Sequence, residues 1–311
     1  MSCSHSTISR TPAALEQSCN DSIYNILHSK KGSGTNYFFR SVVKSSEYVD
    51  YHLNLERVSK YIRSLPHIYR NELSVKSIGH YDGEDILRID IPGRGATPRK
   101  KVVITAGVHG NESAGVVTSL EFIKKNIYNP HVRNNFDIVI IPYLNPGGLK
   151  NNSRRLNNNI DLNRTFKKSA EQRVTNILRS THEDEHFDLS LDLHEAPTRD
   201  KFFIIKSEVD DNYLTKNVLS NIDTNYLVTD KLGQYPGEMM SATSNKKAYD
   251  LYAPGEVASS NIGTVKGFYR HNMNVFYSYT LEAPGKFDLD KKIDIYTNIV
   301  EYYFSEFLKI K

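Results

Sequence analysis

Residues 101–112 read Lys-Val-Val-Ile-Thr-Ala-Gly-Val-His-Gly-Asn-Glu, an apolar run that passes directly into polar residues. The β-branched residues at its start predict a buried strand over Lys101–Ala106. A helix is predicted next, over Ser113–Lys125. His109 would then follow the strand and Glu112 would begin the helix, and the glycines of the connecting turn would let both side chains face one point.

Other apolar segments also end in polar residues. They are Phe136–Tyr143 before Asn145-Pro146-Gly147, Phe187–Leu193 before His194, and Val275–Leu281 before Glu282. Further helices are predicted at Glu171–Arg179 and Asp290–Leu308. Strands that alternate with helices are typical of an α/β fold, in which ligands gather at the carboxyl ends of the strands. We therefore expect a functional site where these polar clusters meet.

The N-terminal part of the chain has a different character. Residues 1–44 are predicted to form a polar, loosely ordered segment, and residues 45–311 a single domain. Over Ser45–Leu65 the apolar residues recur at helical spacing, just before Pro66. The two strands of a hairpin are predicted next, at Leu73–Ile78 and Asp85–Ile91.

Composition excludes several classes of protein. The 311 residues carry a formal net charge of +4, with 39% hydrophobic and 24% charged residues, which is unlike collagen or a disordered chain. The apolar runs are shorter than the ~20 residues of a membrane span, so no membrane association is expected. The basic run Arg99-Lys100-Lys101 is not interleaved with aromatic residues, so no nucleic-acid partner is expected either. Cys3 and Cys19 are the only cysteines and no signal peptide is visible, which together predict a cytoplasmic location.

Three side chains are candidate metal ligands. His109 and Glu112 offer an imidazole nitrogen and a carboxylate oxygen, donors that suit Zn²⁺. His194 ends an apolar strand and is either a third ligand or a histidine satisfied in the core. Two histidines and one carboxylate leave a fourth position open, as in catalytic zinc sites, so one Zn²⁺ per chain is predicted. The charged stretch that contains His182 and His186 is expected to be solvated.

The order of these motifs resembles that of the zinc metallocarboxypeptidases of the carboxypeptidase A type. The related succinylglutamate desuccinylase/aspartoacylase group shares most of the pattern. The resemblance covers about residues 45–311 and implies a catalytic domain with a mixed, largely parallel β-sheet flanked by helices, of the phosphorylase/hydrolase-like type. The motifs that carry it are Gly107-Val108-His109-Gly110-Asn111-Glu112, Asn145-Pro146-Gly147, Asp161-Leu162-Asn163-Arg164-Thr165-Phe166, His194 and Thr280-Leu281-Glu282.

The resemblance also implies roles for residues around the metal. Glu282 would be the general base that takes a proton from water and returns it to the departing amine. Asn163 and Arg164 would hold the terminal carboxylate of the substrate. Asp161 would accept a hydrogen bond from His109. 

Two further assignments stay open at this point. An arginine would stabilise the oxyanion, and either Arg154 or Arg155 could do so; the Arg155-x-Asn157 arrangement favours Arg155. Tyr252 is the best match for the family's capping tyrosine.

The chain also departs from the digestive carboxypeptidases. Asn111 replaces an arginine, Glu195-Ala196-Pro197 replaces a Ser-Tyr pair, and the interval from Glu112 to His194 is shorter. The leading hypothesis is a zinc-dependent hydrolase that cleaves a C-terminal peptide bond of a small peptide. The alternative is an N-acyl-amino-acid deacylase of the aspartoacylase type, which Asn111 and the short interval favour, whereas the helix-forming sequence after Glu282 favours the first. A third hypothesis is an inactive relative that binds peptides.

Overall fold

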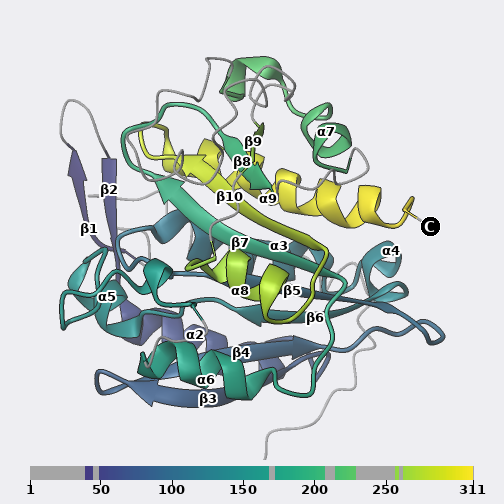
Figure 1. Ribbon diagram of the computed structural model, residues 1–311, viewed down its shortest axis with the longest axis horizontal. Helices are drawn as coiled ribbons and strands as arrows, with labels where there is room; N and C mark the ends of the chain where they lie inside the picture. The colour runs from purple at the N-terminus through teal and green to yellow at the C-terminus, as the bar shows by residue number, and fades with distance from the viewer. Residues whose placement is uncertain are drawn as a thin grey trace, which may run out of the picture.

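The centre of the molecule is an eight-stranded mixed β-sheet, drawn in Figure 1 from a computed structural model. Its order from edge to edge is β3 (Ser74–Tyr81), β4 (Glu84–Ile91), β6 (Phe136–Ile141), β5 (Lys100–Ala106), β7 (Leu189–Ala196), β10 (Tyr277–Pro284), β8 (Phe203–Lys206) and β9 (Glu256–Ala258). The four central strands β6, β5, β7 and β10 are parallel, while β4 and β8 run antiparallel beside them. The predicted mixed, largely parallel sheet is therefore confirmed. The structure describes residues 39–44, 49–167, 172–206, 214–228, 256–258 and 262–310.

Helices cover both faces of this sheet. One hydrophobic core joins the sheet to α2 (Leu55–Ile68), α3 (Ser113–Asn126), α7 (Leu214–Leu219) and α9 (Leu289–Phe307). A second core joins the other face to α6 (Arg173–Thr181) and α8 (Val265–His271). Successive side chains of a strand point to opposite faces, so Val102 and Ile104 enter the first core and Val103 the second. This explains why β5 is a continuous apolar run in the sequence.

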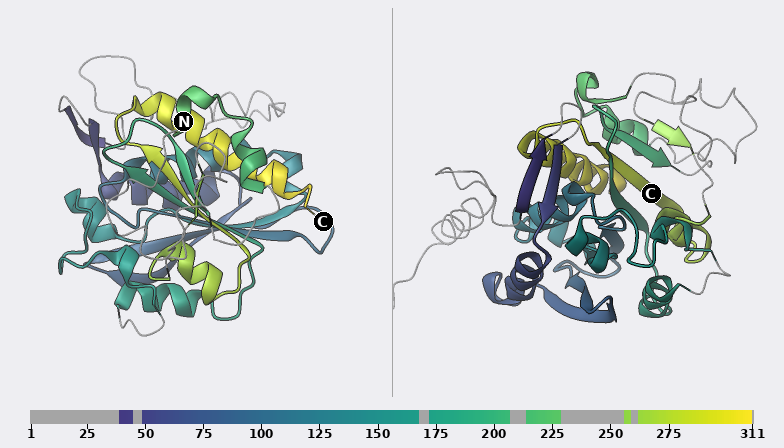
Figure 2. Two further views of the ribbon diagram at one scale, coloured as in Figure 1. Left: turned by 45° about the horizontal axis from the view of Figure 1, so that its top comes forward. Right: turned by 90° about the vertical axis from the view of Figure 1, so that its left-hand side faces the viewer.

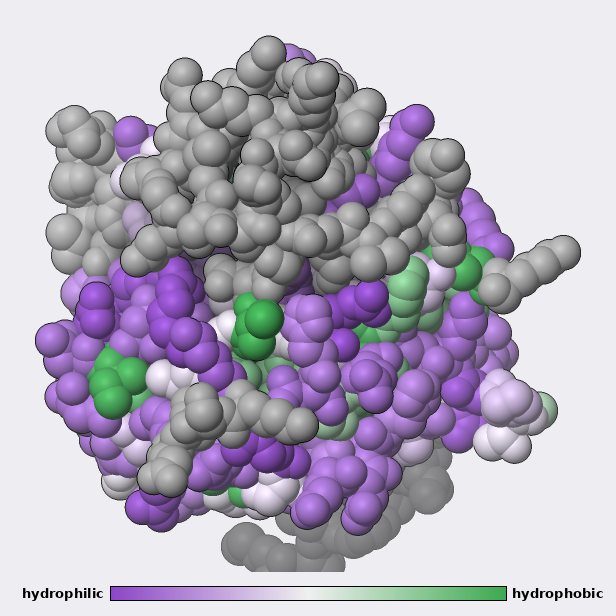
Figure 3. All heavy atoms as spheres, viewed as in Figure 1, coloured by the Kyte–Doolittle hydropathy of each residue, from purple (hydrophilic) through white to green (hydrophobic). Residues whose placement is uncertain are grey.

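Shorter elements complete the chain. The helices α4 (Pro130–Arg133) and α5 (Pro146–Asn151) flank β6, and single 3₁₀ turns occur at Leu162–Arg164 and Thr224–Tyr226. None of the helices in the described parts of the chain has the length and apolar character that a membrane span requires. The face in Figure 3 is mostly hydrophilic where it is coloured, with small and separate hydrophobic patches.

The structure corrects the prediction of a helix over Ser45–Leu65. Val49–Leu53 forms strand β2, which pairs antiparallel with β1 (Phe39–Lys44) in a separate ribbon that Figure 2 shows beside the main sheet. The helix α2 starts only at Leu55, because the Asn54 side chain accepts a hydrogen bond from the Arg57 amide (3.1 Å) and caps the first turn. It continues to Ile68, through Pro66. Residues 39–44, predicted to be loosely ordered, are thus the partner strand.

The other predicted helices and strands are found within a few residues of their expected limits. α3, α6 and α9 correspond to the helices predicted from Ser113, Glu171 and Asp290. The predicted hairpin is formed by β3 and β4, which pair antiparallel across a turn at Asp82 and Gly83. These elements bring the carboxyl ends of β5, β7 and β10 to one edge of the sheet.

Candidate metal centre and active site

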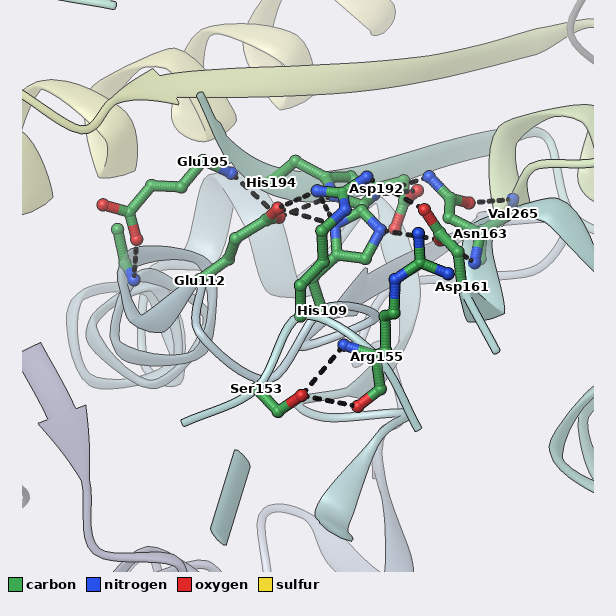
Figure 4. Close-up of polar contacts among 12 residues, drawn as sticks. His109, Glu112, Ser153, Arg155, Asp161, Asn163, Asp192, His194, Glu195 and Val265 are labelled. Carbon is green, nitrogen blue, oxygen red and sulfur yellow. Dashed lines mark hydrogen bonds and ion pairs between the residues drawn. The ribbon is translucent and has the colours of Figure 1, made fainter. Parts of the chain in front are cut away.

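His109, Glu112 and His194 converge at this edge. His109 lies in the turn after β5, Glu112 is the N-cap residue of α3, and His194 belongs to β7. One Glu112 oxygen lies 2.6 Å from His109 Nδ1 and the other 2.7 Å from His194 Nδ1. One potential ligand atom from each residue lies within 4.8 Å of the others. Figure 4 shows the Glu112 carboxylate directed toward these histidines.

The chemistry of this cluster fits a divalent metal ion. All three side chains are at most 3% exposed. Burial alone would raise the pKa of Glu112, but the imidazoles of His109 and His194 lower it below its ordinary value, so its carboxylate is ionised. Two nitrogen donors and one ionised oxygen donor are a ligand set that zinc accepts, with one position left for water or substrate.

Each histidine also contacts a second carboxylate through its other ring nitrogen. His109 Nε2 lies 3.2 Å from Asp161, and His194 Nε2 lies 2.8 Å from Asp192. Thr105 donates a hydrogen bond to Asp192 (2.7 Å) and fixes this carboxylate. Such contacts orient an imidazole and leave Nδ1 directed at the metal position.

Asp192 is a site residue that the sequence analysis missed. Its signal was its position in the strand: residues two apart in a strand lie on one face, so Asp192 and His194 point the same way. An acidic residue inside the apolar run of β7 required a buried partner. Asp192 is 1% exposed, and His194 together with Thr105 provides its hydrogen bonds.

Two glycines make the turn around His109 possible. Gly107 has a φ of +57°, a left-handed backbone conformation that side chains rarely adopt. A Cβ atom at Gly110 would lie 1.9 Å from the carbonyl carbon of Gly148 in α5. Only glycine therefore allows the turn to approach α5 closely enough to present His109 to the cluster.

Glu282 lies on the strand next to His194. The two residues are paired in the parallel register of β10 and β7, and both line one cavity. Burial raises the pKa of Glu282 to about 7, against the opposing influence of His194. No hydrogen bond to its carboxylate is formed by the residues that the structure describes. A carboxylate with this pKa can accept and release a proton near neutral pH.

The two candidate arginines differ in where they point. One guanidinium nitrogen of Arg154 lies 3.2 Å from Glu112, and another lies 3.2 Å from Asp161. Arg155 instead donates to the main-chain carbonyl of Asn159 (3.0 Å) and does not line the cavity. The preference for Arg155 is therefore corrected in favour of Arg154. Neighbouring residues of a loop face different directions, and the sequence spacing could not distinguish them.

Asn163 and Arg164 lie in the 3₁₀ turn that follows Asp161. Asn163 Nδ2 is 3.4 Å from His194 Nε2, and its Oδ1 accepts a hydrogen bond from the Val265 amide (2.9 Å). Arg164 donates to the Asn163 carbonyl (2.8 Å) and lines the cavity. Tyr252 lies outside the described residues.

The cavity itself measures about 200 Å³ and contains more cationic than anionic side chains. It is lined by His109, Glu112, Arg154, Asn163, Arg164, His194, Glu195, Ala196, Pro197, Thr198, Arg199, Phe203, Ile205, Thr264, Lys266, Thr280 and Glu282. The metal cluster, Glu282 and the cationic side chains thus face one space. Such a space can accommodate a small substrate with a carboxylate group.

His182 lies apart from this site and corrects another expectation. It is completely buried, not solvated, whereas the His186 side chain is 75% exposed. His182 Nδ1 lies 3.0 Å from Glu185, and its Nε2 lies 3.1 Å from the Tyr269 hydroxyl. His182 is buried because it packs against α8, where Tyr269 lies. The charged residues that neighbour it in the sequence do not indicate this contact.

Comparisons with known proteins agree with this geometry. Residues 98–251 match the family described as the succinylglutamate desuccinylase/aspartoacylase catalytic domain. No curated protein matches the sequence significantly.

Solved structures share the fold at low sequence identity. A proposed metallopeptidase from Shewanella amazonensis has a TM-score of 0.65 and 16% identity, with 85% of this chain and 97% of that chain covered. A metallo-carboxypeptidase from Burkholderia cenocepacia has a TM-score of 0.62 and 14% identity, with 82% of this chain and 69% of that chain covered. The metallo-carboxypeptidase from Pseudomonas aeruginosa in complex with (2-guanidinoethylmercapto)succinic acid has a TM-score of 0.60 and 15% identity. The match covers 82% of this chain and 69% of that chain. The sheet and these likenesses show that this chain has the zinc carboxypeptidase-like fold, and residues 98–251 are similar to the succinylglutamate desuccinylase/aspartoacylase catalytic domain.

Proposed function

We propose that this protein is a zinc-dependent hydrolase that cleaves the C-terminal amide bond of a small substrate with a free carboxylate. The observation that carries this proposal is the common cavity of Glu282, the His109–Glu112–His194 cluster and Arg154. A protein that only bound peptides would not need a proton acceptor beside a metal site. The inactive alternative is therefore disfavoured.

The metal would supply the electrophilic part of the chemistry. A zinc ion held by His109, Glu112 and His194 would polarise the scissile carbonyl and lower the pKa of a water molecule. Asp161 and Asp192 would keep both imidazoles oriented toward it, through the contacts at 3.2 and 2.8 Å.

Glu282 would carry out the proton transfers. Its carboxylate would take a proton from the attacking water and return it to the nitrogen of the leaving amine. A pKa of about 7 suits both steps, because the same oxygen must accept a proton and then release it.

The cationic residues would orient the substrate and stabilise its charge. Arg154 lies beside Glu112 and would stabilise the negative charge that develops on the carbonyl oxygen. Arg164, with Asn163, would hold the terminal carboxylate, since a guanidinium can bind a carboxylate through two hydrogen bonds. Arg199 and Lys266 also line the cavity, which supports a substrate with acidic groups.

An N-acyl-amino-acid deacylase is the second candidate function. The family match over residues 98–251 favours it, because that family is named for such enzymes. The helix α9, which follows β10 directly, favours the carboxypeptidase reading, because aspartoacylase-type chains usually append a β-rich domain there. Both reactions break an amide bond next to a carboxylate and would use the same residues.

A substrate panel separates the two candidates. Zinc-loaded protein is assayed with dipeptides and with N-acyl amino acids that share the same C-terminal residues, and Glu282→Gln serves as the inactive control. We expect release of the C-terminal amino acid from dipeptides. Activity only with N-acyl amino acids would establish the second function, and zinc content well below one per chain in metal-replete protein would contradict both.

A further inference from the structure

The C-terminal helix α9 contains a charged residue in a position where packing alone would favour an apolar one. Lys292 is 0% exposed and forms an ion pair with Glu195, which is 5% exposed. Removing two charges from water is unfavourable, and an apolar pair of similar volume often stabilises a fold as well or better. The role of this ion pair is therefore sought in what Glu195 contacts, besides the packing of α9 against the sheet.

Glu195 links this buried charge to the metal cluster. Its Oε2 accepts a hydrogen bond from the Ala114 amide in the first turn of α3 (2.9 Å). Its own amide donates to Glu112 Oε2 (3.1 Å), the same oxygen that contacts His194. Lys292 therefore holds a residue that fixes both the start of α3 and the carboxylate of a metal ligand, as Figure 4 shows for Glu195 and Glu112.

One helical turn later, Tyr296 contacts the strands of the site. Residues four apart lie on one face of a helix, so Tyr296 points to the same side as Lys292. Its hydroxyl accepts a hydrogen bond from the His194 amide (2.9 Å) and lies 2.6 Å from the Leu281 carbonyl oxygen, to which it can donate. These contacts join β7 and β10 beside the register pair of His194 and Glu282.

We propose that Lys292 and Tyr296 are positioning residues of the metal centre. Lys292 sets the place of Glu112 through Glu195, and Tyr296 sets the place of His194 relative to Glu282. The inference rests on the proposed function only in taking zinc as the metal. Neither residue lines the cavity, so neither is a catalytic residue.

Zinc affinity and the coordination spectrum test this proposal without an activity assay. Lys292→Met alone would leave the Glu195 carboxylate buried without a counter-charge, so the double variant E195Q/K292M is used. Tyr296→Phe removes one hydroxyl and keeps the ring. The matched control is Tyr303→Phe, a buried tyrosine of the same helix whose hydroxyl lies 3.2 Å from Thr215, away from the cluster.

Zinc dissociation constants are measured by competition with a chromophoric chelator, and the visible absorption bands of the Co²⁺-loaded proteins report ligand geometry. We expect E195Q/K292M and Tyr296→Phe to bind zinc about 10- to 100-fold more weakly than the wild type. Their Co²⁺ bands should shift, whereas Tyr303→Phe should stay within about twofold of the wild type with unchanged bands, since it alters no contact to a ligand.

The outcomes separate this inference from the proposed function. If the wild type binds no zinc, the proposed function fails. If the wild type binds zinc and both variants match it in affinity and Co²⁺ spectrum, the positioning role fails and the proposed function stands. A change in only one variant overturns the role of the other residue. If E195Q/K292M does not fold, the Lys292–Glu195 pair serves stability and the Tyr296→Phe result alone decides the role of Tyr296.

Discussion

Glu282 is partly buried, is paired with His194 in the strand register, and accepts no hydrogen bond from the described residues. Glu282→Gln keeps the shape but cannot accept a proton, so we expect turnover to fall by at least about 10²-fold with zinc content unchanged. Turnover number and zinc per chain are the measurements. Glu183→Gln, at an exposed position, is the control, and near-normal turnover in Glu282→Gln would remove the residue from its role.

The adjacent arginines offer a matched pair of variants. Arg154 reaches Glu112 and Asp161, whereas Arg155 donates to the Asn159 carbonyl. We expect Arg154→Ala to lower kcat/KM by about 10²- to 10³-fold, the effect of losing one oxyanion donor. Arg155→Ala should stay close to the wild type. Equal losses in the two variants would contradict the assignment of Arg154.

A variant of Arg164 tests the proposal that this residue binds the terminal carboxylate of the substrate. Arg164→Ala should raise KM for substrates with a free terminal carboxylate by about 10- to 100-fold, the loss of a charge-assisted hydrogen bond. Substrates whose carboxylate is blocked as an amide should show no further rise in KM, because they lack the group that Arg164 would hold. An unchanged KM with free carboxylates would place the binding group elsewhere in the cavity.

At the scale of elements, the site depends on how closely the turn after β5 approaches α5. Gly110→Ala would place a Cβ atom 1.9 Å from the Gly148 carbonyl carbon, so one element must move. We expect a loss of about 1–3 kcal/mol in the free energy of unfolding, and weaker zinc binding as His109 shifts. Chemical denaturation and chelator competition measure the two effects.

The hairpin between β3 and β4 supplies the control for this prediction. Gly83 has a φ of +79° and no heavy atom within 4 Å of its Cβ position. Gly83→Ala should lower stability through backbone strain alone and leave zinc affinity unchanged. A Gly110→Ala protein with wild-type zinc affinity would show that the close approach to α5 does not position His109.

At the scale of the whole molecule, a buried polar network predicts how stability changes with pH. Arg88 in β4 forms an ion pair with Glu185 (2.7 Å), which also contacts His182 (3.0 Å). Burial alone would raise the pKa of Glu185, but His182 and Arg88 lower it to about 2. Burial keeps the pKa of His182 below its ordinary value. Both groups therefore bind fewer protons in the folded state than in the unfolded chain.

Stability should consequently fall as the pH decreases. Below about pH 6.5 the unfolded chain protonates His182 more readily than the folded protein does, and from about pH 5 downward the stabilisation from Glu185 is lost as well. Glu185→Gln should destabilise the protein by about 1.5–3 kcal/mol at pH 7, the value of hydrogen bonds to charged groups. The difference from the wild type should shrink toward pH 3. Urea denaturation across this pH range measures it, and a constant difference would contradict the assignment.

The sequence by itself determined the local parts of this protein. The apolar run before His109, the glycines of the turn and the three-residue step to Glu112 all act within a dozen residues, and β5, the turn and α3 follow from them. The helix α9 was likewise predicted from the sequence. The motif order was enough to indicate the fold family and His194, because each polar cluster ends a strand.

Only the tertiary structure decided what depends on contacts between distant segments. Val49–Leu53 forms a strand because its backbone pairs with β1. The spacing of apolar residues in the sequence does not show this pairing. Arg154 faces the cluster, His182 is buried, and Lys292 reaches Glu195 only after the helices pack onto the sheet. The periodicity and spacing of residues reflect local backbone preferences. The direction of a loop side chain and the partner of a buried charge depend instead on residues up to about a hundred positions away.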